Sequence, residues 1–445
     1  MVIALAMPSP RTLAASLPML WVVLLAFSRQ GAEAQRSCSP SSLRELTVFL
    51  ADSNCQSYAL TALDLSGTTM KQATEVGAAL ARSKDLHTLS MPRTSPNMHV
   101  ITMLTIAFKQ GSGLKVLDFS HNGLDEDLCN ALAEGMRHAT GLRRLNLVNC
   151  NVDDDCAVLL ALVLSEPAVE VTHLNLYHNR ITSRGASFLS SYLASRNVIE
   201  TLDVGMNPLG DAGVSAVSRV LDSCTSITSL SLSSVQATAH GAEVLARAVA
   251  GTRLRRLSFS KNYAVGPAGG EALGQHLKQA RFLEYVDVSM CALGNRGAAS
   301  VLDGLSESKN LQKLLLAVND LDEQTVVAPF VATHPALEVL DLSHNHLDDA
   351  WCLELIDSLR VTACFFRISL RAVRLSQTAV TFQCLQQLQE VYAGLECDAA
   401  SLPTVRAVVC SCVCVCCLFV WVLLCVCVCV CVCACVCACV SVCVC

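Results

Sequence analysis

The sequence lacks the motifs by which catalysis and nucleotide or metal binding are usually recognised. It has no phosphate-binding loop, no G-x-S-x-G and no H-E-x-x-H motif. No Cys/His spacing before the C-terminal tail resembles a zinc site. Charged residues make up only 16% and the formal net charge is −6, which does not indicate a nucleic-acid partner. No asparagine lies in an N-x-S/T sequon, which disfavours a heavily glycosylated surface role. We therefore expect no enzyme, no cofactor and no metal ion.

The N-terminus has the three parts of a secretory signal peptide. Arg11 precedes an apolar run over residues 13–27, and the small residues Ala32 and Ala34 frame an A-x-A site before Gln35. We therefore predict a signal peptide over residues 1–34. An uncleaved signal anchor is the main alternative. A buried first helix is disfavoured because no repeat pattern starts before Leu60.

The C-terminus, residues 403–445, is an apolar Cys/Val tail. No charged residue follows Arg406, and residues 407–427 are long enough for a transmembrane segment. A second interpretation is a translated microsatellite, because a TG repeat read in frame encodes alternating Cys and Val. A third is a lipid-anchor signal, since small residues at 398–401 precede the apolar stretch.

Fifteen of the 26 cysteines lie in this tail, from Cys410 onward, and eleven precede it. Two pairs sit near the ends of the remaining chain, and in an oxidising compartment each could form a disulfide: Cys38 with Cys55 and Cys384 with Cys397. The other seven are expected to be buried thiols: Cys129, Cys150, Cys156, Cys224, Cys291, Cys352 and Cys364.

A repeat of about 28 residues dominates the chain. We use the central residue of each L-x-x-L-x-L strand as its anchor. The anchors lie at Leu63, Leu89, Leu117, Leu145, Leu174, Leu202, Leu230, Leu257, Val286, Leu314, Leu340 and Val373. In each unit, apolar residues two apart predict a strand with one face turned inward.

The second half of each unit predicts a turn and a helix. Asn or Cys follows the anchor by five residues, where its side chain can bond the backbone of the turn and form a ladder through stacked units. The ladder residues are Asn122, Cys150, Asn179, Asn207, Asn262, Cys291, Asn319 and Asn345. Glycines recur at one helical position, where we expect close packing between neighbouring helices: Gly185, Gly213, Gly241 and Gly297, with Gly269 one residue beyond it.

These units resemble the ribonuclease-inhibitor-like subclass of leucine-rich repeats. The pattern LxxLxLxxNxLxxxGxxxLxxxL is matched over residues 171–193 by VTHLNLYHNRITSRGASFLSSYL, with Val171 at the first leucine. The resemblance implies an α/β horseshoe of about 12 repeats, with a parallel sheet inside and helices outside. We place the repeats at 58–380, an N-terminal cap at 35–57 and a C-terminal cap helix at 381–402.

Three units depart from the pattern. The unit at Leu89 has Thr94 on the ladder and two prolines, so we expect it to be distorted. The unit at Leu230 has Val235 on the ladder, which removes one rung. The last step is five residues longer than usual, which predicts a bulge near residues 361–367, and its unit carries Thr378 on the ladder.

Strand residues on either side of each anchor should face the concave surface. Most are small, but two groups combine cationic and aromatic side chains, which often dominate interfaces. The candidate partner-binding residues are Arg144, His173, Tyr177, His178 and Arg180 in one group, and Arg256, Tyr285 and Lys313 in the other. By contrast, His121, His178 and His344 recur at a turn position, and the acidic run 153–155 suits a helix N-terminus but lacks calcium-ligand spacing.

The resemblance implies a binding scaffold, since similar proteins are nuclease inhibitors, receptor sensor domains and GTPase-activating proteins. We expect a non-enzymatic protein-interaction scaffold that enters the secretory pathway and is extracellular or membrane-anchored through the tail. An intracellular regulator in the cytoplasm is the alternative, because relatives with 28-residue units are mostly cytosolic. A structural surface-coat component is a third possibility. The ligand itself is not readable from the fold.

Overall fold

The computed structural model describes residues 37–51, 57–59, 64–322, 324–334, 336–363, 370–391 and 396–398. The predicted signal peptide (1–34) and Cys/Val tail (403–445) lie outside these residues, as does most of the predicted bulge. Among the described residues, no helix is long and apolar enough to cross a membrane.

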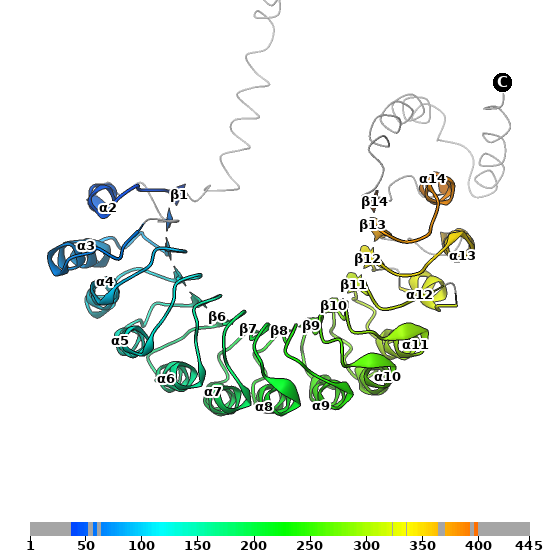
Figure 1. The fold of residues 1–445 in the computed structure, drawn as a ribbon, viewed down its shortest axis with the longest axis horizontal. Helices are drawn as coiled ribbons and strands as arrows, with labels where there is room; N and C mark the ends of the chain where they lie inside the picture. Colours follow the sequence, from blue (N-terminus) through cyan, green and yellow to red (C-terminus); the bar gives the residue numbers. More distant parts are fainter. Residues whose placement is uncertain are drawn as a thin grey trace, which may run out of the picture.

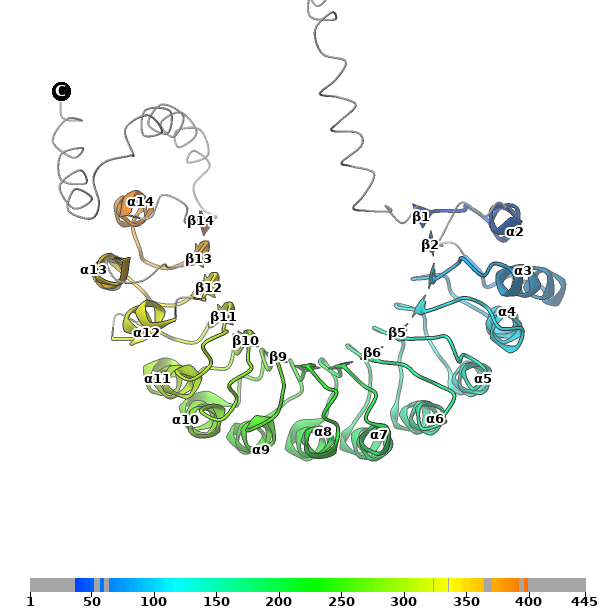
Figure 2. The ribbon, with the colours of Figure 1, turned by 180° about the vertical axis from the view of Figure 1, so that it is seen from behind.

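The described strands form one parallel sheet in which chain order and spatial order coincide, β1 to β14. It lines the inner side of a horseshoe (Figures 1 and 2). The strands are β1 Ser37–Cys38, β2 Ser57–Ala59, β3 Thr88–Ser90, β4 Val116–Asp118, β5 Arg144–Asn146, β6 His173–Asn175, β7 Thr201–Asp203, β8 Ser229–Ser231, β9 Arg256–Ser258, β10 Tyr285–Asp287, β11 Lys313–Leu315, β12 Val339–Asp341, β13 Ala372–Arg374 and β14 Glu396–Asp398.

A helix follows each strand from β1 to β13 and lies on the outer side of the horseshoe (Figure 1). The helices are α2 Leu43–Ala51, α3 Met70–Arg82, α4 Met98–Lys109, α5 Glu126–Met136, α6 Asp154–Leu164, α7 Ser183–Arg196, α8 Gly210–Ser223, α9 Ala239–Val249, α10 Gly266–Leu277, α11 Gly294–Leu305, α12 Val327–Thr333, α13 Asp349–Ala363 and α14 Phe382–Val391. This arrangement confirms the predicted α/β solenoid.

The register of the sheet confirms the anchors from Leu89 to Val373, each of which pairs with the next along the chain. The first predicted anchor, Leu63, is wrong: Tyr58 in β2 pairs with Leu89. The leucine pattern misleads here because Leu65 follows the turn. Its N–H donates to the Thr94 carbonyl, as the N–H of Leu124, two repeats later, donates to the Cys150 carbonyl.

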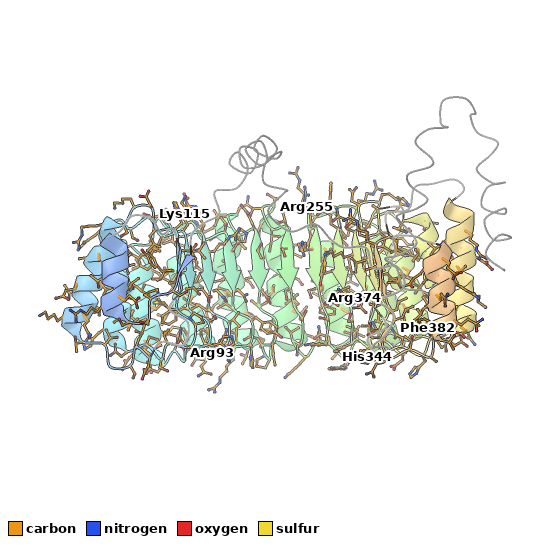
Figure 3. All side chains as sticks on the ribbon, turned by 90° about the horizontal axis from the view of Figure 1, so that it is seen from above. Arg93, Lys115, Arg255, His344, Arg374 and Phe382 are labelled. Atoms are coloured by element: carbon orange, nitrogen blue, oxygen red, sulfur yellow. A yellow bond between two sulfur atoms is a disulfide. The ribbon has the colours of Figure 1, made fainter. Side chains whose placement is uncertain are left out.

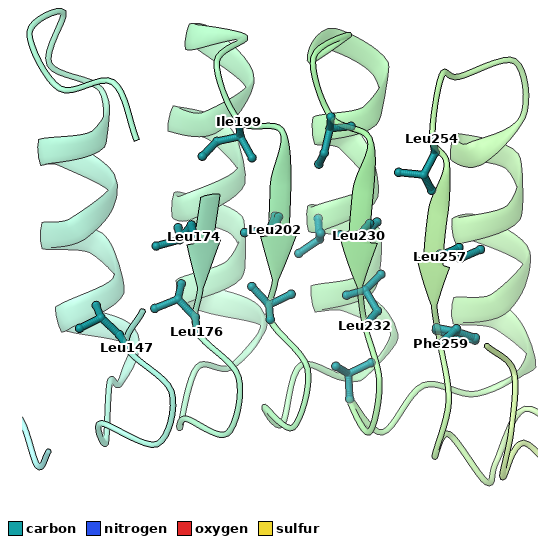
Figure 4. Close-up of a cluster of buried hydrophobic side chains, with 14 of the residues drawn as sticks. Leu147, Leu174, Leu176, Ile199, Leu202, Leu230, Leu232, Leu254, Leu257 and Phe259 are labelled. Atoms are coloured by element: carbon teal, nitrogen blue, oxygen red, sulfur yellow. The ribbon is translucent and has the colours of Figure 1, made fainter. Parts of the chain in front are cut away.

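The core lies between the sheet and the helices. Anchors such as Leu174, Leu202, Leu230 and Leu257 point from the strands toward the helical layer and stack along the solenoid (Figure 4). Each of these side chains is at most 1% exposed, so each repeat buries its apolar face against its neighbours.

The ladder holds the turns that leave the strands. Asn179 accepts hydrogen bonds from the N–H groups of Cys150 and Val152 and donates to the carbonyls of Leu147 and Leu176, all at 2.8–3.0 Å. Asn122, Asn207, Asn262, Asn319 and Asn345 repeat this pattern in whole or in part. The Leu89 unit keeps a regular register instead of being distorted, and its Thr94 hydroxyl donates to Met91 O at 3.2 Å.

The two cysteines on the ladder occupy the same position as the asparagines but form weaker hydrogen bonds. The Cys150 thiol lies 3.2 Å from Phe119 O, and the Cys291 thiol lies 3.3 Å from Phe259 O. Burial raises the pKa of each thiol to about 12. Both thiols therefore stay protonated at neutral pH.

Neighbouring helices are joined by tight packing and by carboxylates that cross between repeats. A Cβ at Gly185 would meet Asp154, and one at Gly241 would meet Asp211, because these carboxylates accept the N–H groups of Gly185 and Gly241 at 3.0 and 3.1 Å. The recurring glycines therefore do mark close contacts between helices, as predicted.

Two features of the cysteines differ from expectation. Cys129 in α5 and Cys156 in α6 form a disulfide between adjacent repeats where two buried thiols were expected. Cys384 is a buried free thiol, so it does not form the predicted cap disulfide with Cys397. The reason is architectural: Cys384 belongs to helix α14 and contacts Asp349 O of α13, whereas Cys397 belongs to strand β14. The other predicted pair includes Cys55, which lies outside the described residues.

Candidate interaction surface

The concave face of the sheet is a continuous surface that the repeats build together, and Figure 3 looks onto it. The anchor of each strand is buried and the residues on either side of it are open. We call the residues before the anchors of β5–β11 the first row: Arg144, His173, Thr201, Ser229, Arg256, Tyr285 and Lys313. We call the residues after the anchors of β4–β12 the second row: Asp118, Asn146, Asn175, Asp203, Ser231, Ser258, Asp287, Leu315 and Asp341.

The first predicted group lies on β5 and β6. Arg144 and His173 are register partners in the first row. Burial, and next the positive charge of Arg144, lowers the pKa of His173, while Glu200 acts in the opposite direction. Tyr177 follows β6, and its ring meets that of His178 edge to face with centroids 6.3 Å apart. The predicted neighbourhood of Arg144 and His173 is therefore present.

His178 and Arg180 lie elsewhere than the prediction implied. They belong to the turn that leaves β6, where His178 has a left-handed backbone with φ of 58°. The equivalent residue of another repeat, His344, lies along one edge of the sheet in Figure 3, while Lys115 and Arg255 lie along the opposite edge. His178 and Arg180 are exposed, but they border the concave face and do not form its floor.

The second predicted group is compact. Arg256, Tyr285 and Lys313 are consecutive register partners on β9, β10 and β11. The Arg256 guanidinium lies over the Tyr285 ring, 4.9 Å from its centroid, which is a cation–π geometry. Burial raises the pKa of the Tyr285 phenol, and the Asp287 carboxylate adds to this effect.

Small side chains form the floor between the two groups. Thr201 and Ser229 continue the first row, and Gly205 and Ser233 lie four residues further along the same two repeats. A Cβ at Gly205 would come within 3.0 Å of the Tyr177 ring. The floor is therefore low, with larger side chains standing on both sides of it.

The second row contains a feature that the sequence analysis missed. Its Asp and Asn side chains accept a hydrogen bond from the backbone N–H two residues later, at 2.9–3.2 Å, in β4, β5, β6, β7, β10 and β12. Asp203 is also largely buried, which raises its pKa. The recurrence of Asp or Asn one residue after the anchor was the available signal.

Four stretches of the chain match a family model described as Leucine Rich repeat: residues 171–190, 197–218, 279–302 and 333–350. The ribonuclease inhibitor of Sus scrofa is 26% identical over 273 residues, which are 60% of this chain and 60% of that protein. The chain is a ribonuclease-inhibitor-like leucine-rich-repeat protein. NACHT, LRR and PYD domains-containing protein 14 of Mus musculus is 27% identical over 313 residues, or 69% of this chain and 28% of that protein.

Solved structures agree with this fold. A chain from the crystal structure of the yeast Rad7 and Elc1 complex superposes with a TM-score of 0.54 at 16% identity, covering 85% of this leucine-rich-repeat protein and 86% of that chain. This likeness concerns the fold. The chain spans about 60% of the ribonuclease inhibitor's length and under a third of the NACHT protein's.

The described part of this leucine-rich-repeat protein contains no group of three or more His, Cys, Asp or Glu side chains suited to a metal ion. A pocket of about 360 Å³ lies where α8 and α9 end, and its charged lining consists of Asp222, Arg247 and Arg253. It includes none of the predicted partner-binding residues. The concave face is thus the best-supported candidate surface.

Proposed function

We propose that this chain is a non-enzymatic scaffold that binds a protein partner across the concave face between β5 and β11. The observation that carries the proposal is the Arg256–Tyr285–Lys313 group, which stands on three consecutive strands beside a floor of small side chains. Rigid strands hold these side chains in place, and Arg and Tyr are enriched among residues that dominate binding energy. The similarity to a ribonuclease inhibitor, whose name states a protein target, supports this function.

Site-specific photo-crosslinking tests this proposal. The photoreactive residue p-benzoylphenylalanine would replace Ser229 on the concave floor or, as a control, the exposed Phe188 on the outer helix α7. We expect protein adducts from position 229 and few from position 188. A purified adduct partner should then lose affinity for the Arg256→Ala variant. Adducts only from position 188 would contradict a concave binding surface.

We also propose that the protein enters the secretory pathway. The signal-like N-terminus motivates this, and the Cys129–Cys156 disulfide between α5 and α6 supports it, because disulfides persist in oxidising compartments. The raised thiol pKa of Cys150 and Cys291 fits the same environment, since buried protonated thiols resist oxidation. Anchoring through residues 403–445 is part of the same proposal.

Intact mass under non-reducing conditions, together with the mature termini, tests the location. A chain that starts at Gln35 and carries the 129–156 disulfide supports secretory entry, and retention of residues 403–445 adds the membrane anchor. A chain with Met1 and two reduced thiols favours an intracellular regulator. The NACHT relatives, in which this chain matches only part of the length, support that alternative.

A further inference from the structure

Exposed cations in the first row stand without acidic partners. Among the strands from β3 to β12, only β5, β9 and β11 have an exposed first residue, and these residues are Arg144, Arg256 and Lys313. Within the described residues, no carboxylate lies within 4.0 Å of any of the three. All three positive charges are therefore available to a ligand.

Two arginines next to these cations in the sequence form ion pairs. Arg143 pairs with Glu170 at 2.6 Å, and Arg255 pairs with Glu284 at 2.8 Å. These two arginines lie at the edge of the sheet, where Figure 3 shows Arg255. Arg143 and Arg255 are thus neutralised by ion pairs within the protein, while Arg144, Arg256 and Lys313 are not.

The aspartates of the second row are occupied by intramolecular hydrogen bonds. Asp118 accepts from Ser90, Ser120 N and Asn146, and Asp287 accepts from Ser289 N and Ser258. Asp203 accepts from Gly205 N, and Asp341 accepts from Ser343 N and pairs with Arg374. These hydrogen bonds hold the aspartates within the sheet but leave their negative charge in place, so the cations of the first row lie beside a row of acidic side chains.

The spacing of the free cations leaves room for a protruding loop of another protein between them. Four strand steps separate Arg144 on β5 from Arg256 on β9, a distance on the order of 19 Å at ~4.8 Å per strand. His173 lies next to Arg144 in this row, and Thr201 and Ser229 fill the remainder with short hydroxyl side chains. A loop of another protein can enter this gap and place carboxylates against the cations on both sides.

We propose that the first row binds an acidic loop of a protein partner, with carboxylates at Arg144 and at Arg256 and Lys313. This inference rests on the proposed function and adds the charge of the partner to it. The second row argues against a nucleic acid, because its aspartates run alongside the cations and a phosphate backbone carries no hydrogen-bond donor to place opposite them. A protein can instead set hydrogen-bond donors opposite the aspartates.

A 20-residue poly-L-glutamate peptide is the first probe, measured against the full chain at low and physiological salt. We expect binding that weakens with salt, and a loss of at least about tenfold in affinity when Arg144, Arg256 and Lys313 are all changed to alanine. The matched control changes Arg143, Arg255 and Lys309 to alanine. It removes the same net charge from neighbouring positions and should cost less than about twofold.

Carbodiimide coupling locates the bound peptide. It joins a carboxylate to an amine in contact, so the glutamate peptide should become attached to Lys313 and not to the exposed Lys309. Attachment mainly at Lys309, or equal losses in both triple variants, would overturn the proposal.

Two further probes separate this inference from the proposed function. If poly-L-lysine binds and poly-L-glutamate does not, the charge assignment is wrong, while a protein-binding concave face stands. If a 20-nucleotide oligo-dT binds more tightly than poly-L-glutamate and the alanine triple variant abolishes it, both the acidic-protein partner and the protein-scaffold function fail.

Discussion

Asp154 at the start of α6 accepts two hydrogen bonds from Thr182 in the next repeat, from its backbone N–H at 2.7 Å and from its hydroxyl at 2.6 Å. The same relation joins Asp211 to Thr238 and Asp349 to Thr381. In each case a carboxylate of one helix caps the N-terminus of the following helix, where a negative charge is favourable. These contacts couple neighbouring repeats in addition to the strand pairing, the ladder and the apolar packing.

The first prediction concerns this cap. Asp154→Ala should lower the free energy of unfolding by about 1–2 kcal/mol, as loss of a helix cap does, because the backbone N–H groups of Thr182 and Gly185 lose their acceptor. Asp155→Ala is the control: this neighbour forms only an exposed ion pair with Arg184, so its loss should cost at most about 0.5 kcal/mol. Urea unfolding measures both variants, and equal small losses would disprove a capping role.

The second prediction compares two rungs of the ladder. Asn179→Ala leaves two N–H groups and two carbonyls without their partner, so it should cost at least about 3 kcal/mol. Cys150→Ala removes a weak thiol donor from the adjacent buried rung and should cost about 1 kcal/mol. The urea midpoint should therefore fall further for Asn179→Ala than for Cys150→Ala. A larger fall for Cys150→Ala would mean that packing contributes more than hydrogen bonding to the stability of the ladder.

Periodicity made most of the fold predictable. A leucine in a strand has one inward direction, so the repeated anchors from Leu89 to Val373 also specify the register. The prediction failed at Leu63 because the first full strand carries Tyr58 at its anchor. Near the end of a solenoid, a local L-x-x-L-x-L match carries less information than the spacing to the next repeat.

The candidate surface was predictable only in part. The rows followed from the period of two, but the contact of Arg256 with Tyr285 depends on side-chain direction.

The Cys129–Cys156 disulfide was missed although the two positions are 27 residues apart, close to one repeat. Equivalent positions in adjacent repeats are neighbours in space, so that spacing could have indicated the bond.

The third prediction concerns the contact of α10 with α11. A Cβ at Gly274 would overlap Ser300 O, which is helix backbone and cannot rotate away. Gly274→Ala should therefore cost more than about 2 kcal/mol through overpacking. Gly67→Ala is the control, because its Cβ would have no neighbour within 4 Å, and its effect should stay within about 0.5 kcal/mol. A melting temperature unchanged by Gly274→Ala would show that α10 and α11 can move apart enough to admit the methyl group without loss of stability.

The fourth prediction concerns thiol reactivity. Burial raises the pKa of Cys150 and Cys291 to about 12, and only the thiolate reacts with iodoacetamide. At pH 8 the folded protein should leave both residues unlabelled, and labelling should appear when urea unfolds the chain. Peptide mass spectrometry measures the extent at each site. Rapid labelling of the folded protein would show that the ladder opens locally.

The last prediction uses His334, which is buried between two repeats. Its ring stacks on Phe330 at 3.8 Å, and its nitrogens lie 3.0 and 3.2 Å from the carbonyls of Phe330 and Leu305. Burial lowers its pKa, an effect that outweighs the two carbonyls, which favour the protonated ring. The folded state therefore holds His334 neutral where the unfolded chain, with a pKa near 6.5, already binds a proton.

Because the unfolded state binds more protons, the free energy of unfolding should keep its full value above about pH 6.5. It should fall as the pH drops through the lowered pKa of His334 in the folded state. Melting temperatures between pH 7.5 and 5 measure this fall, and His334→Gln should reduce its slope. The exposed His240→Gln variant serves as the control and should keep the wild-type slope. An unchanged slope in His334→Gln would mean that other groups control the acid sensitivity and that His334 takes up its proton without loss of the fold.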